Sequence, residues 1–215
     1  MKRVRRKALL LDRDGVINVE RNYVHRRDAF EFVPGIFDLC RSAQRLDYLL
    51  IVVTNQAGIG RGYFSEADFV ELMDWMIDKF AQNDVRIARS YHCPYHPVFG
   101  VGEYKRESFD RKPNPGMLLR AKSELDLDLG SSILIGDKLS DIQAGRAAGV
   151  GTAILFTSEP VTSMEEMPCY VFFSLDDIRR TFFSTEIDLP RGQEAGVAGL
   201  LEPAVRQRGA KNQIR

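Results

Sequence analysis

The sequence predicts an α/β fold of three layers, in which helices cover both faces of a central parallel sheet. Two observations lead to this class. Short apolar runs such as residues 8–11 and 132–135 have the length and continuity of strands that are buried on both faces. The stretches between these runs carry apolar residues at helical spacing. Alternating strands and helices are typical of a parallel sheet with helical crossovers.

The expected elements can be placed in order along the chain. Strands are expected at residues 8–11, 49–53, 86–92, 132–135 and 151–156, with a smaller one at 169–173. Helices are expected at 34–45, starting at Pro34, at 65–82, with Ser65 as its N-cap, and at 114–125, 137–148 and 175–182. The 65–82 segment carries a stripe that we interpret as core packing rather than a cofactor site: Phe69, Leu72, Met73, Met76 and Phe80.

We expect one domain over residues 1–185. Its insertions are too short to form a separate cap domain. Residues 15–27 are expected to form a flap and residues 94–110 a loop, both on the side where the strands end. Residues 186–215 combine Gly, Ala and scattered charge without a sustained period, so a flexible tail is expected there.

The composition limits the possible classes of function. The chain has 215 residues, of which 44% are hydrophobic and 28% charged, and this suits a soluble domain with one sizeable core. Thirty basic and thirty acidic residues give a net charge of zero. The protein therefore has no overall electrostatic attraction for nucleic acid or a membrane surface. The apolar run at 8–11 is too short for a signal peptide or a membrane span, and three scattered cysteines give no disulfide framework. We expect a cytoplasmic protein and a monomer.

Asp12 and Asp14 directly follow the first strand, and Gly15 allows a sharp turn after them. Open α/β sheets bind ligands at the carboxyl ends of their strands. One carboxylate of such a pair can attack phosphorus, while the other protonates the leaving oxygen and later takes a proton from water. Carboxylates beside a phosphate need a cation, so Mg²⁺ is expected. Taken alone, such a pair is more often a solvated turn or a helix cap.

Two later segments carry groups that this chemistry needs. Thr54 and Asn55 end the second strand, and their hydroxyl, amide and backbone N–H groups can hold phosphoryl oxygens; an ordinary turn is the alternative. Arg111 and Lys112 precede a helix start, which favours anions, although a solvated basic pair would have the same sequence.

The fourth strand also ends in polar residues. Asp137 and Lys138 follow it, and Asp141 comes one helical turn later. A Mg²⁺ ion shared with Asp12 would require an acid at the position of Asp137. Asp141 has a plainer interpretation, which is that it orients Lys138 or caps the following helix.

The motifs at these strand ends resemble those of a known family over residues 8–156. They are D-R-D-G-V-I-N at 12–18, N-Y-V-H at 22–25, V-V-T-N-Q-A-G-I-G-R-G at 52–62, C-P-Y-H-P at 93–97, R-K-P-N-P-G-M-L-L at 111–119 and G-D-K-L-S-D at 136–141. The sequence resembles the heptose bisphosphate phosphatases of the haloacid dehalogenase superfamily, whose nearest relatives are the histidinol-phosphate phosphatases. The resemblance implies a Rossmann-like fold. It also implies Mg²⁺-dependent removal of the 7-phosphate of D-glycero-D-manno-heptose 1,7-bisphosphate through an aspartyl-phosphate, in the biosynthesis of activated heptose for surface glycans.

The resemblance also implies roles for the matching residues. Asp12 would be the nucleophile and Asp14 the general acid and base, while Thr54 and Lys112 would stabilise the transferring phosphoryl group. Mg²⁺ would be held by Asp12, by the backbone carbonyl of Asp14 and by Asp137. Arg111 would recognise the second phosphate, and Lys138 would assist at the site. The sugar pocket would be lined by Glu20, Arg21, Asn22, Tyr23, Asn55, Gln56 and Ala57.

One loop departs from the family pattern. Members of the family usually hold a structural zinc through a Cys-x-His pair and a later Cys-x-Cys pair. Here only Cys93 matches, because the other three positions carry Tyr95, Ser108 and Asp110. A different zinc site would have no second thiolate and would have to use His92, Cys93, His96 and Asp110. We therefore expect no structural zinc, and we expect prolines and aromatic side chains to hold the loop.

Two other functions remain open from the sequence. A phosphatase for histidinol phosphate or another small sugar phosphate would use the same chemistry. A non-catalytic protein that binds a phosphorylated ligand could keep the fold. The presence of both acids, Asp12 and Asp14, argues against this third function.

Overall fold

The computed structural model describes residues 5–158 and 170–184, and it is built around a six-stranded sheet with the strand order β3-β2-β1-β4-β5-β6. All neighbouring strands are parallel. The strands are β1 (Ala8–Leu11), β2 (Leu49–Asn55), β3 (Ile87–Cys93), β4 (Ile133–Gly136), β5 (Thr152–Phe156) and β6 (Tyr170–Phe172). The predicted three-layer α/β class is confirmed.

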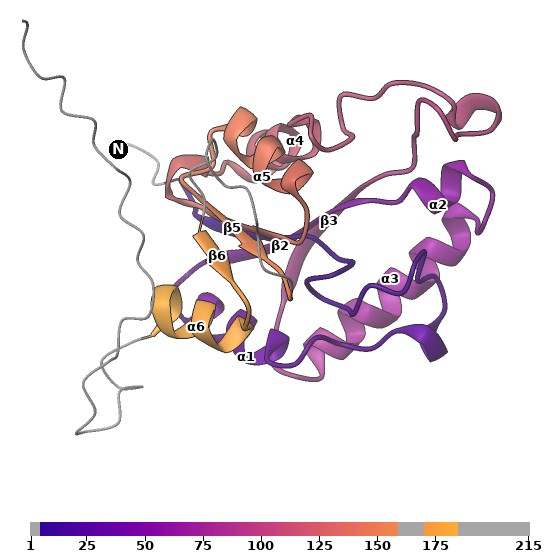
Figure 1. Cartoon of the computed structure of the whole chain (residues 1–215). Coiled ribbons are helices and arrows are strands. Elements are labelled where there is room, and N and C mark those ends of the chain that lie inside the picture. The colour runs from indigo at the N-terminus through magenta and orange to yellow at the C-terminus, as the bar shows by residue number, and fades with distance from the viewer. Residues whose placement is uncertain (1–4, 159–169, 185–215) are drawn as a thin grey trace, which may run out of the picture.

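Helices cover both faces of this sheet (Figure 1). α1 (Ile36–Arg45), α3 (Glu66–Ala81) and α6 (Leu175–Phe183) lie on one face, and α4 (Gly116–Leu125) and α5 (Leu139–Ala148) lie on the other. A short helix, α2 (Ala57–Gly60), follows β2. Three 3-10 helices complete the described structure: Arg27–Ala29, Gly102–Tyr104 and Leu129–Ser131.

Alternate residues of the central strand β1 supply two separate cores. Leu9 and Leu11 pack in the cluster that contains Phe80 of α3, whereas Leu10 packs in the cluster that contains Met117 of α4. All three leucines are fully buried. A strand that is apolar at every position is therefore buried on both faces, as expected for the middle of a parallel sheet.

The start of α3 shows how local sequence fixes an element. The Ser65 hydroxyl accepts a hydrogen bond from the Asp68 backbone N–H, and the Asp68 carboxylate accepts one from the Ser65 N–H. This reciprocal capping box satisfies two N–H groups that have no partner inside the helix. The predicted apolar stripe is buried at every position: Phe69, Leu72, Met73, Met76 and Phe80.

Other boundaries differ from the prediction by small shifts with local causes. The first helix begins at Ile36 rather than Pro34, because Gly35 is its N-cap with a left-handed φ of 86°. α4 begins at Gly116 with Pro115 as its N-cap. The helix α2 was not predicted. The expected tail at 186–215 and residue 169 lie outside the described residues.

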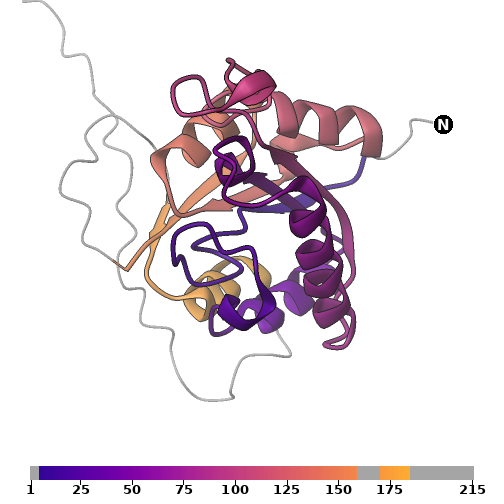
Figure 2. The same ribbon diagram turned by 90° about the vertical axis from the view of Figure 1, so that its right-hand side faces the viewer.

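The segments that follow β1 and β3 both leave the sheet at the carboxyl ends of the strands, and they lie beside α2 (Figures 1 and 2). Apart from turns and bridges, they contain only the 3-10 helices Arg27–Ala29 and Gly102–Tyr104. Within residues 5–158 and 170–184, no inserted domain therefore covers the ends of the strands. The absence of a separate cap from the whole protein stays a prediction.

Candidate active site

Asp12 is held at the end of β1 by its neighbours on both sides. Its backbone N–H donates to the Ile135 carbonyl at 3.0 Å, which extends the pairing between β1 and β4 by one residue. Its Oδ1 accepts a hydrogen bond of 2.7 Å from the Arg13 N–H and lies 3.0 Å from Lys112 Nζ. No hydrogen bond is made to Oδ2 within the described residues. The second oxygen of this carboxylate is thus left for a ligand.

Lys112 is almost completely buried, and its ammonium group has three partners. Nζ lies 3.0 Å from Asp12 Oδ1, 2.5 Å from Asp141 Oδ1 and 2.9 Å from the Val53 carbonyl oxygen. Burial by itself lowers the pKa of Lys112, but the carboxylates of Asp12 and Asp141 outweigh it and raise that pKa. The ammonium is therefore a fixed positive charge beside the predicted nucleophile.

The backbone of Lys112 is fixed by Asn55. The Asn55 amide donates to the Lys112 carbonyl at 3.0 Å, and its oxygen accepts from the Lys112 N–H at 3.1 Å. Both ends of the amide are thus engaged with protein. The structure shows that Asn55 joins β2 to the Lys112 segment, and its predicted contact with the sugar stays a prediction.

Three carboxylates gather at the ends of β1 and β4. Ligand oxygens of Asp12, Asp137 and Asp141 all lie within 4.8 Å of one another. Burial raises the pKa of Asp12 to about 7; Lys112 opposes this shift, and Asp141, Asp137 and Asp14 add to it. Burial also raises the pKa of Asp137, while Lys138 lowers it. Such crowded buried acids are stable as anions only beside a cation.

The cluster has the chemistry of a Mg²⁺ site. Asp137 Oδ1 is buried and has no hydrogen-bond partner among the described residues, so it offers an unused oxygen ligand. Asp141 Oδ1 is already paired with Lys112. The predicted ligands Asp12 and Asp137 are therefore brought together, and Asp141, which was predicted only to orient Lys138 or cap a helix, joins the same cluster.

Two glycines make this approach possible. A Cβ on Gly15, whose φ is 87°, would lie 2.4 Å from Asp137 Oδ2, and a Cβ on Gly136 would lie 2.2 Å from the Asp141 Cβ. The turn after β1 can thus pass directly against Asp137. The Asp141 carboxylate also accepts from the Lys138 N–H at 3.0 Å, so the predicted cap of α5 is present.

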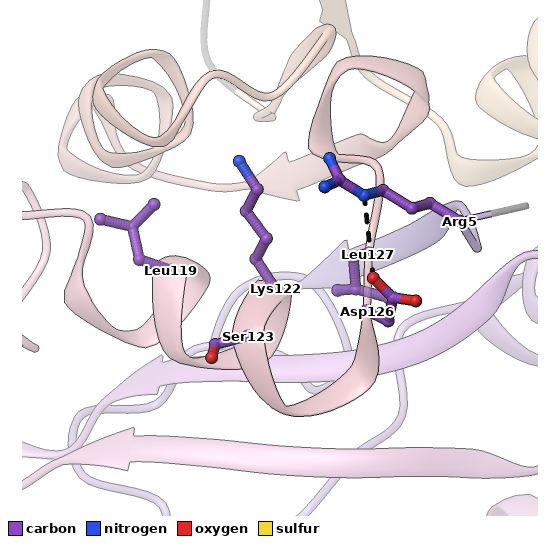
Figure 3. A pocket seen from close by; sticks show the side chains of 6 residues that line it. All are labelled: Arg5, Leu119, Lys122, Ser123, Asp126 and Leu127. Atoms are coloured by element: carbon purple, nitrogen blue, oxygen red, sulfur yellow. Dashed lines mark ion pairs between the residues drawn. The ribbon is translucent and has the colours of Figure 1, made fainter. Parts of the chain in front are cut away.

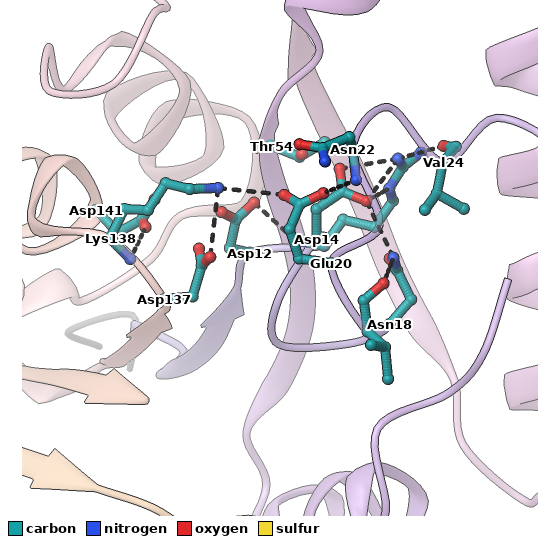
Figure 4. Close-up of polar contacts among 12 residues, drawn as sticks. Asp12, Asp14, Asn18, Glu20, Asn22, Val24, Thr54, Asp137, Lys138 and Asp141 are labelled. Carbon is teal, nitrogen blue, oxygen red and sulfur yellow. Dashed lines mark hydrogen bonds and ion pairs between the residues drawn. The ribbon is translucent and has the colours of Figure 1, made fainter. Parts of the chain in front are cut away.

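The carboxylate of Asp14 is surrounded by donors (Figure 4). Arg13 donates to it through Nε at 3.2 Å and through Nη2 at 2.8 Å to each oxygen. Asn18 Nδ2 donates at 3.0 Å and Gln56 Nε2 at 2.8 Å. Gln56 Nε2 also lies 2.9 Å from Thr54 Oγ1. The predicted residues Asp14, Gln56 and Thr54 therefore belong to one hydrogen-bonded group.

Arg13 was not predicted as part of the site. Its side chain is fully buried, donates to the Val24 carbonyl at 2.7 Å and has its Cζ 5.6 Å from the centroid of the Phe69 ring. Nothing in the local sequence distinguishes it from an exposed arginine, because its partners come from the segment after β1 and from α3. The arginine thus connects Asp14, the predicted general acid, to the flap at residues 15–27.

The flap reaches the acidic cluster through one ion pair. Lys138 Nζ lies 3.3 Å from Glu20 Oε2 and 3.3 Å from Asp137 Oδ2 (Figure 4). Burial lowers the pKa of Lys138, but Asp137 and Glu20 outweigh it and raise that pKa. Two of the predicted sugar contacts, Asn22 and Tyr23, have left-handed φ values of 55° and 59°. Such backbone is costly for residues other than glycine and is often found at ligand sites.

The remaining predicted contacts are more dispersed. Arg21 is exposed and pairs with Glu31. Ala57 is the first residue of α2. Arg111 is partly buried, and its Nη1 donates to the Tyr95 carbonyl at 3.2 Å. The roles of these three residues stay predictions.

The four positions that would hold a family zinc are occupied by other interactions. Burial raises the pKa of the Cys93 thiol. Hydrogen bonds from the Tyr95 backbone and the Ser108 side chain lower it, but burial has the larger effect. Asp110 forms an ion pair of 2.8 Å with Arg120. The loop is further held by aromatic contacts, since Arg106 lies 4.0 Å from the Tyr95 ring centroid and Tyr95 packs near Tyr104.

The two histidines that could have served a different zinc site also have other partners. His96 Nδ1 accepts N–H groups from Val98 and Phe99 at 3.2 and 3.0 Å. The His92 ring packs against Phe69 with 4.4 Å between centroids. Among the described residues, the one group of three or more potential metal ligands is Asp12, Asp137 and Asp141. Zinc content stays a prediction.

A shallow surface hollow of about 260 Å³ lies away from these residues (Figure 3). It is near the end of α4, and its wall includes the ion pair between Arg5 and Asp126 at 3.7 Å. None of the predicted site residues lines it. Its lining residues are Arg5, Leu119, Lys122, Ser123, Asp126 and Leu127.

Comparison with known proteins identifies the family. A family model described as HAD-hydrolase-like matches residues 109–178. A Burkholderia mallei protein named D-glycero-alpha-D-manno-heptose-1,7-bisphosphate 7-phosphatase is 58% identical over 152 residues, which are 71% of this chain and 80% of that protein. The chain belongs to the heptose bisphosphate phosphatases of the haloacid dehalogenase superfamily. The resemblance predicted from the motifs is confirmed.

Two further relatives agree with this family. A Vibrio cholerae protein named D-glycero-beta-D-manno-heptose-1,7-bisphosphate 7-phosphatase is 48% identical over 173 residues, covering 80% of this chain and 92% of that protein. The crystal structure of D,D-heptose 1,7-bisphosphate phosphatase from B. bronchiseptica, complexed with magnesium and phosphate, superposes with a TM-score of 0.71 at 27% identity. It covers 81% of this chain and 97% of that one. Magnesium in that family member agrees with the expected cofactor. None of the helices in the described residues is long and apolar enough to cross a membrane.

Proposed function

We propose that this protein removes the 7-phosphate from D-glycero-D-manno-heptose 1,7-bisphosphate. The observation that carries the proposal is the 58% identity to a phosphatase named for this substrate. The site geometry supports the chemistry, because a buried carboxylate with an unused oxygen lies beside a buried ammonium group. We further propose that the protein acts as a cytoplasmic monomer in the biosynthesis of activated heptose for surface glycans.

The reaction would proceed in two displacements. In the first, an oxygen of Asp12 attacks phosphorus, the bond from phosphorus to the C7 oxygen breaks, and Asp14 gives its proton to that oxygen. In the second, Asp14 takes a proton from water, the water oxygen attacks phosphorus, and the bond to Asp12 breaks to release phosphate. Both residues end in their starting states.

Charge stabilisation would come from Mg²⁺ and from side chains that are already in place. Mg²⁺, held by Asp12, Asp137 and the Asp14 carbonyl, would neutralise phosphoryl oxygens. Lys112 is fixed next to Asp12, so it needs little rearrangement as charge develops on the equatorial oxygens. Thr54 Oγ1 accepts from Gln56 and can donate its own hydrogen to a phosphoryl oxygen.

A substrate panel tests this proposal. The wild-type protein with Mg²⁺ would be assayed on both anomers of the heptose bisphosphate, because the relatives include enzymes named for each. Histidinol phosphate and simple sugar phosphates would be assayed in parallel. We expect the highest kcat/KM on a heptose bisphosphate, with ³¹P NMR showing release from C7. Equal kcat/KM values across the panel would reject the heptose assignment and leave a general phosphatase.

Arg111 provides a second arm of the same test. Its loss should reduce kcat/KM on the bisphosphate by roughly 10- to 100-fold, because one charge-assisted pair to a phosphate is lost. Histidinol phosphate lacks a second phosphate and should be much less affected. An equal effect of Arg111→Ala on both substrates would contradict recognition of the distal phosphate by this residue.

A further inference from the structure

Arg61 has an unusual environment for an arginine. Its Nε is buried without a hydrogen-bond partner, and its side chain makes no hydrogen bond or ion pair within residues 5–158 and 170–184. Its side chain lies beside two aromatic rings. Arg61 Cζ lies 4.4 Å from the centroid of the Phe99 ring and 5.5 Å from that of Tyr23. The guanidinium thus lies beside two aromatic rings, and its N–H groups have no hydrogen-bond acceptor among the described residues.

The three segments that meet at Arg61 are fixed to one another. Arg61 directly follows α2, whose Gly60 carbonyl accepts a hydrogen bond of 2.7 Å from the Val101 N–H. A Cβ at Gly60 would lie 2.3 Å from the Pro94 carbonyl oxygen, so the 94–110 loop approaches α2 closely. Tyr23 comes from the flap and has left-handed backbone. The rings on Arg61 are therefore supplied by the two segments that border the site.

A second arginine without an ion pair lies in the same region. Arg111 donates to the carbonyl of Tyr95, whose neighbour Pro94 lies against Gly60, the residue before Arg61. Arg111 forms no ion pair among the described residues. Burial lowers the pKa of Arg111; Cys93 and Glu107 act in the opposite direction, and Arg61 lowers it further. Burial lowers the pKa of His96, as do Arg111 and Arg61. Two cations that repel each other, with free donors and no paired carboxylate, are arranged to receive an anion.

We propose that Arg61 and Arg111 together bind the phosphate at the far end of the substrate, with Tyr23 and Phe99 holding the Arg61 guanidinium flat. This inference rests on the proposed function, since a monophosphate has no group for this site. A phosphate offers oxygens for the parallel N–H donors of a guanidinium, and the stacked rings limit the entropy lost on binding. Arg61 would thus determine specificity rather than take part in the chemistry.

Paired substrates that differ only in the distal phosphate test this role. Heptose 1,7-bisphosphate and heptose 7-phosphate share the phosphate that is removed. We expect Arg61→Ala to lower kcat/KM on the bisphosphate by about 10- to 100-fold, mainly through KM, and to change the monophosphate value less than about threefold. Arg61→Lys should recover only part of the loss, because an ammonium cannot form the planar pair of bonds. Arg146→Ala, which removes an exposed arginine of α5, is the matched control and should leave both substrates unchanged.

A binding experiment separates this inference from the proposed function. In the Asp12→Asn background, calorimetry with each compound measures the preference for the bisphosphate without turnover. Loss of that preference on Arg61→Ala supports the distal site even where wild-type turnover of the heptose bisphosphate is poor. The inference is overturned by an Arg61→Ala protein that keeps the preference, or by one that loses affinity equally for both compounds.

Discussion

Lys112 Nζ lies 2.5 Å from Asp141 Oδ1, and both side chains are almost completely buried. This pair joins the segment before α4 to the first turn of α5. The same ammonium group is 3.0 Å from Asp12, so a single cation serves two buried carboxylates. Removing one partner of a buried pair is far more costly than replacing the whole pair by neutral groups, because an uncompensated charge stays inside.

The first prediction follows from this arrangement. Lys112→Met should lower the free energy of unfolding by about 3 to 5 kcal/mol, measured by urea denaturation without Mg²⁺. Adding Asp12→Asn and Asp141→Asn to Lys112→Met should recover much of this loss, because the buried carboxylates are then neutral. If the triple variant is as unstable as Lys112→Met alone, the lost packing of the lysine stem is the cause and the charge argument fails.

The second prediction concerns pH and the charge of Asp12. Its pKa is raised from 3.8 to about 7, so between those values the folded state keeps a proton that the unfolded state has lost. The stability of the metal-free protein should therefore fall as pH rises through this window. The Asp12→Asn variant has no ionisable carboxyl group at this position and does not pay this cost. Its Tm should therefore exceed that of the wild type at pH 8 and approach it at pH 5. The difference at pH 8 corresponds to roughly 1 to 4 kcal/mol, at about 2 to 4 °C per kcal/mol.

Magnesium provides the control for that comparison. Mg²⁺ should raise the Tm of the wild type by binding the folded state, and it should have much less effect on Asp12→Asn or Asp137→Asn. Identical Tm profiles of the wild type and Asp12→Asn from pH 5 to 8 would contradict an energetic cost for the Asp12 charge.

The third prediction separates the roles of the two acids. Asp12→Asn should abolish Mg²⁺-dependent phosphate release, whereas Asp14→Asn should slow it by about 10² to 10⁴-fold through loss of proton transfer. Rapid-quench mass spectrometry of Asp14→Asn should detect a phosphorylated chain, and Asp12→Asn should show none. Substantial turnover by Asp12→Asn would rule out its role as nucleophile.

The fourth prediction concerns zinc. The protein purified without added metal should contain much less than one zinc per chain by elemental analysis, because three of the four family ligand positions carry other residues. Treatment with a chelator selective for transition metals should leave the circular dichroism spectrum unchanged, and activity should return with Mg²⁺ alone. Zinc in near-stoichiometric amount would show that His92, Cys93, His96 or Asp110 bind it.

The sequence predicted the parts of the fold that are marked locally. Buried strands appear as short apolar runs, and α3 carries its own cap in Ser65 and Asp68. The start of α1 was misplaced because Gly35 takes a left-handed conformation, which a proline one residue earlier does not reveal. The helix α2 was missed because four residues with two glycines have low helix propensity, and its last carbonyl, that of Gly60, is bonded by Val101, which is distant in sequence.

The residues of the site could be predicted only where their chemical role follows directly from the residue type. The acids after β1 and β4 could be expected to share a metal, because carboxylates at adjacent strand ends meet. The burial of Arg13 could not be predicted, since two of its contacts, with Val24 and Phe69, are not to its neighbours in sequence. The same holds for the contact between Asp141 and Lys112, because each residue is locally consistent with a simple helix end.

The position of β1 in the sheet has a consequence for synthesis of the chain. β1 is synthesised before β2 and β4, and it pairs with β2 on one side and with β4 on the other. Until Ile133–Gly136 is available, an entirely apolar strand keeps an open edge of N–H and C=O groups, which favours association between nascent chains. A chain interrupted before β4 would also lack Asp137 and Asp141. The pairing of β4 with β1 therefore closes this edge in the same step that brings the acids of the site together.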